Sequence, residues 1–309
     1  MKKFFAVLCA LTAISVMGLK AEEAGKDAEV LTKTYDLTDF HGVAAGDSFN
    51  VNLVQDSEWI VELEYSDFLE KYIDVKVKDG VLRLYLKDLP SSLRNSRQYK
   101  DGKVLSATIH MPDLDRLYLS GAAKLWQDGK FSVPDKDFRL ELSGASSADN
   151  LKIDARSARL AISGASKCKS LQGAFEKVKM EVSGAAKCEI NADADDWDVV
   201  ISGSGMVEMG GAECNTIDIE TSGAAKAKVY VPSALLRYEG TGASAMNAVD
   251  APTTAAKVEL SGASSCRVAV KESLDVEASG ASACRYKALN GGLLHSKFNI
   301  SRGSKVSEL

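Results

Sequence analysis

The 309-residue sequence is poor in proline, aromatic residues and histidine. Its five prolines leave room for long strands, because proline lacks the amide donor that the interior of a sheet needs. The histidines, His41, His110 and His295, share no spacing typical of a zinc site or a catalytic triad. The net charge of −5 lacks the basic balance of nucleic-acid-binding domains. We therefore expect no nucleic-acid partner, no metal and no cofactor.

Catalytic signatures are also missing from the sequence. No Ser-x-x-Lys, Gly-x-Ser-x-Gly, Walker or Gly-x-Gly-x-x-Gly element stands in a suitable context, which predicts a non-enzymatic protein. The densest acidic cluster could bind a metal as β-helical polysaccharide lyases do, although a solvated charged loop is the favoured interpretation. This cluster consists of Asp193, Asp195, Asp196 and Asp198.

The sequence has one long apolar run, which lies near its start. Lys2 and Lys3 precede apolar residues 4–17, a run too short to span a bilayer as a stable helix. This pattern is typical of a secretory signal peptide, which we place at residues 1–21. Polar residues 22–34 predict a flexible leader. We thus expect an exported protein of the periplasm or cell surface that does not span the membrane.

A Ser-Gly-Ala motif repeats through the remainder of the chain. Ten copies, some degenerate, start 18–23 residues apart, and a period near 20 is typical of a solenoid. Counted from each serine, positions −3, −1 and +5 are mostly apolar, as expected for strands with one buried face. The copies start at Ser120, Ser143, Ser163, Ser183, Ser202, Ser222, Thr241, Ser261, Ser279 and Ser301.

These columns predict an all-β fold: a single-stranded, parallel, right-handed β-helix of about ten coils over residues 106–309. Each coil would contain two short strands joined at the Ser-Gly-Ala corner, and a variable third side of about eight residues. A leucine-rich repeat would need a helical side, and a propeller would need longer repeats. Residues 35–105 predict an N-terminal β-strand cap, with a hairpin at Asp79-Gly80, a helical turn at 66–72 and an exposed basic connection at 89–103.

The repeated corner has two interpretations. Glycine follows the first residue in nine of the ten copies, so the corner needs a positive φ or has no room for a Cβ atom. A tight bend would explain the small residues, and so would a flat seam that packs against another protomer or an extended ligand. The candidate binding or packing seam comprises Ser143, Gly144, Ala145, Ser163, Gly164, Ala165, Ser183, Gly184, Ala185, Ser222, Gly223, Ala224, Ser261, Gly262 and Ala263.

Two further columns carry charge or sulfur. Position −2 holds glutamates flanked by cations, which favours a solvated charge lattice over a calcium site. The coil with Asp218 and Glu220 is the least compensated and the best place for an ion. Four cysteines at position +5 share their column with apolar residues and are interpreted as small buried hydrophobes, with disulfides between coils as the alternative. The glutamates are Glu141, Glu181, Glu220, Glu239, Glu259 and Glu277; the cysteines are Cys168, Cys188, Cys266 and Cys284.

The order of several segments resembles a known family. Residues 39–43 (DFHGV), 49–53, 73–82 and 111–117, followed by serial Ser-Gly-Ala corners, resemble the putative auto-transporter adhesin, head GIN domain family of secreted bacterial proteins. The resemblance covers residues 39–290. It implies export, a β-helical fold and adhesion, and it carries no catalytic residues.

The leading hypothesis is therefore an exported, non-enzymatic β-solenoid that binds an unknown envelope or surface ligand, either a glycan or a protein. One alternative is a polysaccharide-active β-helix enzyme that uses Asp195 and Asp196. The other is a structural envelope protein that forms homo-oligomers through its small-residue seam.

Overall fold

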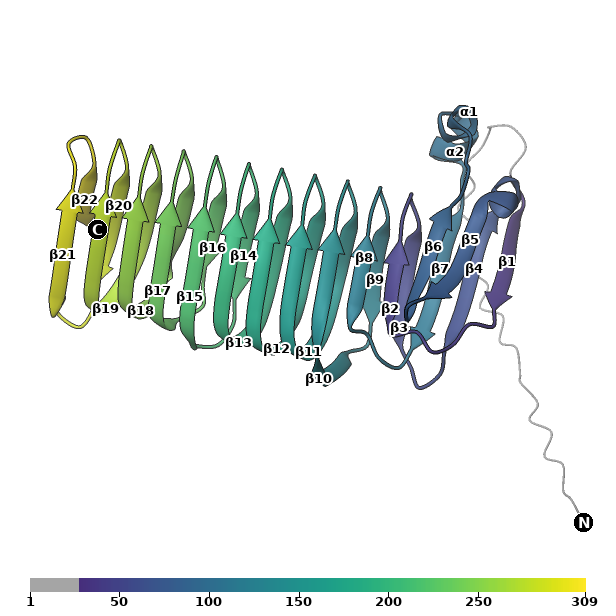
Figure 1. The fold of residues 1–309 in the computed structure, drawn as a ribbon, viewed down its shortest axis with the longest axis horizontal. Helices are drawn as coiled ribbons and strands as arrows, with labels where there is room; N and C mark the ends of the chain where they lie inside the picture. Colours follow the sequence, from purple (N-terminus) through teal and green to yellow (C-terminus); the bar gives the residue numbers. More distant parts are fainter. Residues whose placement is uncertain (1–27) are drawn as a thin grey trace, which may run out of the picture.

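The computed structural model describes residues 28–309 and shows a β-solenoid of parallel stacked coils, which confirms the predicted fold class. The coils stack along one long axis, from the purple N-terminal end to the yellow C-terminal end (Figure 1). The predicted signal peptide at 1–21 and residues 22–27 of the predicted leader lie outside the described residues. The strands in the body of the solenoid are β8 (Arg116–Leu119), β9 (Lys124–Asp128), β10 (Phe131–Leu142), β11 (Ser147–Ile162), β12 (Lys167–Val182), β13 (Lys187–Ile201), β14 (Met206–Gly210), β15 (Cys214–Thr221), β16 (Lys226–Val229), β17 (Ser233–Gly240), β18 (Ala245–Leu260), β19 (Ser265–Ala278), β20 (Ala283–Ala288), β21 (His295–Ile300) and β22 (Lys305–Glu308).

The coils contain more strand than the sequence predicted. Strands β11 and β12 each run for 16 residues between consecutive corners, so the expected third side is itself extended. The physical reason is that alternation continues through this side, where Leu151 and Ile153 are fully buried while their polar neighbours are not. In these coils the predicted third side is therefore continuous with the strands on either side of it, and the strands are not the two short ones that the sequence predicted.

The inward columns form one continuous core along the axis. Leu140, Leu160 and Met180 occupy position −3 of successive coils, pair in register and are fully buried. Position −1 is apolar in most coils but is Thr221 in one coil and Gly240 in the next, and the side chain of Tyr238 explains both exceptions. Its hydroxyl lies 2.7 Å from Thr221 Oγ1, and a Cβ atom on Gly240 would lie 2.7 Å from the same hydroxyl.

The Ser-Gly-Ala corners stack directly on one another. Gly164 has a φ of +72°, and a Cβ atom built on it would lie 2.6 Å from the carbonyl oxygen of Gly144 in the preceding coil. Both reasons proposed for the glycine therefore hold at this corner. The amide of Ala165 donates a hydrogen bond to that same carbonyl oxygen, with an N–O distance of 2.7 Å. One coil below, Ala145 donates to Gly121 O at the same distance, so hydrogen bonds link the corners into a ladder.

The N-terminal end combines antiparallel strands with an additional coil. Strands β2 and β3 pair in parallel with β8 and β9, so the stacked coils begin before residue 106, where the sequence placed the first repeat. Strand β1 pairs antiparallel with β4, so residues 30–34, which the sequence predicted to belong to a flexible leader, are part of the sheet. The elements here are β1 (Val30–Tyr35), β2 (Gly42–Ala45), β3 (Asn50–Gln55), β4 (Ile60–Ser66), the 3₁₀ helix η1 (Asp67–Tyr72), β5 (Ile73–Lys78), β6 (Val81–Leu86), α1 (Ser91–Arg94), α2 (Arg97–Asp101) and β7 (Leu105–Met111).

Two local predictions at this end agree with the structure. Strands β5 and β6 form an antiparallel hairpin whose turn is Asp79-Gly80, and η1 occupies the predicted helical turn. The basic connection at 89–103 folds into α1 and α2, which lie beside the corner edge of the solenoid (Figure 1). Within residues 28–309, no helix is long and apolar enough to cross a membrane.

Candidate functional site

The structure brings the 15 predicted seam residues to one edge of the solenoid. At this edge the glycines and alanines of the corners are exposed, and the serines are exposed or half-buried. The next residue of each corner turns inward: Ser166 is fully buried, and its hydroxyl donates to Leu142 O (3.3 Å) and Ser163 O (2.6 Å). The inner side of the corner is thus structural, and the outer side is a continuous exposed ridge. A ligand or partner at this ridge stays a prediction.

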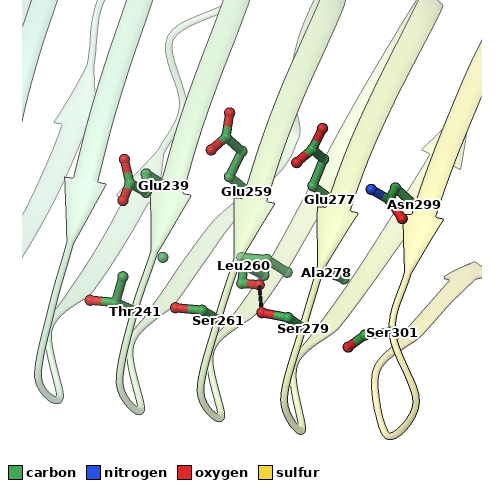
Figure 2. Close-up of a pocket in the computed structure, with 11 residues that line it drawn as sticks. Glu239, Thr241, Glu259, Leu260, Ser261, Glu277, Ala278, Ser279, Asn299 and Ser301 are labelled. Atoms are coloured by element: carbon green, nitrogen blue, oxygen red, sulfur yellow. Dashed lines mark hydrogen bonds between the residues drawn. The ribbon is translucent and has the colours of Figure 1, made fainter.

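A groove runs beside the ridge near the C-terminal end, with a volume of about 280 Å³. Figure 2 shows the two rows of side chains that line it: carboxylates from position −2, and hydroxyls from the corner. The carboxylate row consists of Glu239, Glu259 and Glu277, which pair in register across three coils, with Asn299 beside them in the next coil. The hydroxyl row consists of Thr241, Ser261, Ser279 and Ser301.

Strand geometry explains why the two rows face one groove. Positions −2 and 0 are two residues apart and point to the same outer side, while the residue between them, such as Leu260, is buried in the core. Adjacent coils repeat both rows at the spacing of hydrogen-bonded strands, about 4.8 Å. The sequence showed each row separately. The two rows are an even number of residues apart, which places them on the same face of a strand, and this spacing was the signal that could have joined them into one site.

Charge in the groove is only partly balanced. Lys257 Nζ lies 2.6 Å from Glu259 Oε1, and the hydrogen bond to this carboxylate raises the pKa of Lys257. Among residues 28–309, neither Glu239 nor Glu277 forms a salt bridge. The Ser279 hydroxyl donates to Leu260 O at 3.3 Å, which fixes one member of the hydroxyl row. The groove therefore presents carboxylate acceptors beside hydroxyl groups, a surface suited to ligands rich in O–H or N–H donors.

The structure corrects the coil predicted to be the best ion site. Arg237 of the next coil donates to both carboxylate oxygens of Asp218, at 3.0 and 3.2 Å, so this carboxylate of the coil is compensated, while Glu220 forms no salt bridge within residues 28–309. In the acidic cluster, Asp198 pairs with Lys179 at 3.3 Å, and Asp193 accepts a hydrogen bond from the amide of Ala212. Across residues 28–309, no group of three or more His, Cys, Asp or Glu side chains could hold a metal ion.

The cysteine column is buried, as the sequence predicted. Cys168 pairs in register with Cys188, and Cys266 with Cys284, and all four are free thiols with an exposure of at most 1%. A hydrogen bond with Cys168, together with burial, raises the pKa of the Cys188 thiol. Burial, together with Cys284, raises that of Cys266. These thiols act as small core residues.

Comparison with known proteins identifies a family and a fold. A family model described as putative auto-transporter adhesin, head GIN domain matches residues 39–233 and 183–288. No curated protein matches the chain. A solved putative adhesin from Parabacteroides distasonis is 17% identical, with a TM-score of 0.51 over 92% of this chain and 98% of that chain.

A second solved structure from the same organism is described as a putative lipid binding protein. It is 14% identical, with a TM-score of 0.50 over 91% of this chain and 96% of that chain. At these identities the likeness concerns the fold alone.

Proposed function

The chain belongs to the putative auto-transporter adhesin, head GIN domain family, and from this premise we propose that it is an exported, non-enzymatic binding protein of the cell envelope. Its ligand is a surface glycan, held along the groove beside the corner ridge. Family membership supports a binding role, and the solenoid offers a long repetitive surface for it.

The observation that carries this proposal is the pair of parallel rows in Figure 2. Glu239, Glu259 and Glu277 present carboxylate oxygens, and the corner hydroxyls form a second row beside them along the same groove. Glycan hydroxyl groups donate strong hydrogen bonds to carboxylates, and hydroxyl side chains can both donate and accept. Because each coil repeats the pattern, a linear glycan can make the same contacts at successive coils.

The alternatives have less support. The acids named for cleavage of a polysaccharide, Asp195 and Asp196, form no salt bridge or side-chain hydrogen bond within residues 28–309. Their neighbours are engaged, because Asp198 pairs with Lys179 and Asp193 accepts a hydrogen bond from a backbone amide, so the cluster offers two free acids. Assembly of copies through the corner ridge would fit its exposed small residues, including Gly164 and Ala165. No second feature of the ridge favours a protein partner.

A binding screen tests the proposal. The purified protein is applied to immobilised neutral oligosaccharides and to envelope fragments, and the bound glycan is recovered and its length measured. We expect reversible binding to a neutral glycan with its length unchanged. Shortened products would show an enzyme. Retention of no glycan, together with a mass in solution that rises with concentration, would favour the assembly protein instead.

A further inference from the structure

A second pocket lies at the opposite end of the solenoid from the groove. It is an open hollow lined by residues of α1, α2 and the first two corners, and its volume is about 580 Å³. Gly121 and Ala122 of one corner and Asp47 of the additional coil contribute to its wall. The sequence marked residues 89–103 as a basic connection, but it gave no reason for this segment to fold over the corners.

Cationic side chains give the pocket its charge. The segment 89–103 contains four cations, Arg94, Arg97, Lys100 and Lys103, and one carboxylate, in a chain of net charge −5. All of these cations except Arg97 line the pocket. Arg94 pairs with Asp47 at 2.9 Å. Within residues 28–309, neither Lys100 nor Lys103 forms a salt bridge, so two ammonium groups are left for an anion.

The ammonium group of Lys103 is held in place and partly desolvated. Its Nζ donates to Tyr99 O at 3.1 Å and lies 4.5 Å from the centroid of the Tyr99 ring. Its side chain is half-buried, and burial lowers the pKa of Lys103 because it removes water from the charged group. A bound anion would restore favourable contacts to this group.

Tyrosine rings form the other part of the lining. The Tyr99 hydroxyl lies 3.2 Å from Ser48 Oγ, which fixes one ring. Tyr85 lies directly on the backbone of Gly46, where a Cβ atom would be only 2.5 Å from the ring. The absence of a side chain on Gly46 therefore lets the Tyr85 ring lie against the backbone between β6 and the corner at Asp47. Aromatic faces pack well against the C–H faces of sugar rings.

The pocket continues into a second hollow along the outer face. Tyr85 and Ser120 line both, and the second hollow has a volume of about 210 Å³. Tyr118 and Ser143 lie along this extension, together with Glu141, whose carboxylate pairs with Arg139. A ligand longer than one sugar can thus extend from the cationic pocket past a second aromatic ring. Inorganic phosphate or sulfate would use the lysines but neither the tyrosines nor the extension.

We propose that this pocket binds an acidic oligosaccharide, with the carboxylate of a uronic acid residue at Lys100 and Lys103 and its ring on Tyr85. The following sugars lie in the extension beside Tyr118. This site goes beyond the proposed function, because its ligand is anionic and its residues are separate from the groove.

Calorimetric titration with tetragalacturonate and with its full methyl ester tests the site. The two probes share the same sugar chain, and in the ester a methyl group on each carboxyl removes its negative charge. We expect the acid to bind at least about tenfold more tightly than the ester, and the difference to shrink as salt screens the lysines. Inorganic phosphate should compete only weakly. Equal affinity for acid and ester, or binding of neither, would overturn the proposal.

Variants locate the site. Lys100 is exposed. The double variant Lys100→Gln with Lys103→Gln should bind tetragalacturonate about tenfold or more weakly, with its far-UV circular dichroism unchanged. Lys187→Gln is the control, because it removes a lysine on a distant coil. Glu259→Gln should leave this affinity unchanged, which separates the site from the groove. Undiminished affinity in the lysine double variant would contradict the assignment.

Discussion

Replacing a single corner glycine should reveal how the solenoid is held together. In Gly164→Ala, the new side chain must accept a φ of +72°, at a cost of roughly 1–2 kcal/mol. Its Cβ atom must also avoid the Gly144 carbonyl oxygen, which would lie 2.6 Å away. The coils can relieve this contact only by separating, which weakens the bond from Ala165 N to Gly144 O and costs about another 1 kcal/mol. We expect a total loss of about 2–4 kcal/mol in the free energy of unfolding.

Gly291 provides the matched control. It also has a positive φ, +87°, but nothing lies within 4 Å of a Cβ atom built on it. Gly291→Ala therefore includes only the conformational cost, about 1–2 kcal/mol, and the entropy lost from the unfolded chain is the same in both variants. Urea unfolding followed by circular dichroism measures both losses. Equal losses would refute the claim that close stacking of the corners, in addition to backbone conformation, requires glycine.

Three further predictions concern hydroxyls, thiols and a carboxylate. Ser166→Ala should destabilise the fold by about 1 kcal/mol in urea unfolding, whereas Ser282→Ala should be neutral or stabilising, because the buried Ser282 hydroxyl has no hydrogen-bond partner. Cys214, whose pKa burial raises to about 11, should react with a thiol reagent at pH 8 only after unfolding; rapid reaction of the native protein would contradict this. The hydrogen bond from Arg156 lowers the pKa of Asp137. The stability that this pair contributes should therefore be present above the ordinary carboxyl pKa of 3.8 and be lost as the pH falls through the lowered pKa. In Arg156→Gln, the pKa of Asp137 measured by NMR should return toward 3.8.

The coils could be predicted because their signals are local and repeated. Alternation identified the buried columns, and the recurring glycine identified the corners. Asp79-Gly80 likewise predicted its hairpin, because both residues tolerate the positive φ values of 54° and 72° that the turn requires. In each case, a few adjacent residues determine the local backbone.

The sequence did not predict the additional coil, because the corner of this coil has a different residue type at the position with positive φ. Asp47, with a φ of 52°, occupies the place that glycine holds elsewhere, and no Ser-Gly-Ala motif marks it. Aspartate tolerates this conformation better than most residues. Its carboxylate also accepts a hydrogen bond from the Leu86 amide at 2.8 Å, which supports the corner. The sequence alone does not pair residues this far apart.

The candidate site was only partly predictable for the same reason. The ridge follows from the repeat itself, but the Arg237–Asp218 pair depends on how neighbouring coils align. The tyrosine and lysine pocket depends on α2 folding back over the first corners, so that Tyr99 meets Ser48. Such contacts between distant segments have no periodic signal in the sequence.

The most direct test of the central claim is the affinity of a groove variant for the neutral glycan that binds best in the screen. Glu259→Gln combined with Glu277→Gln keeps the shape of the groove and removes two carboxylates. The control, Glu181→Gln combined with Glu220→Gln, changes the same column outside the groove. We predict that the groove variant binds at least about tenfold more weakly and that the control binds as the unmodified protein does. Equal affinity in all three proteins would contradict a binding role for the groove.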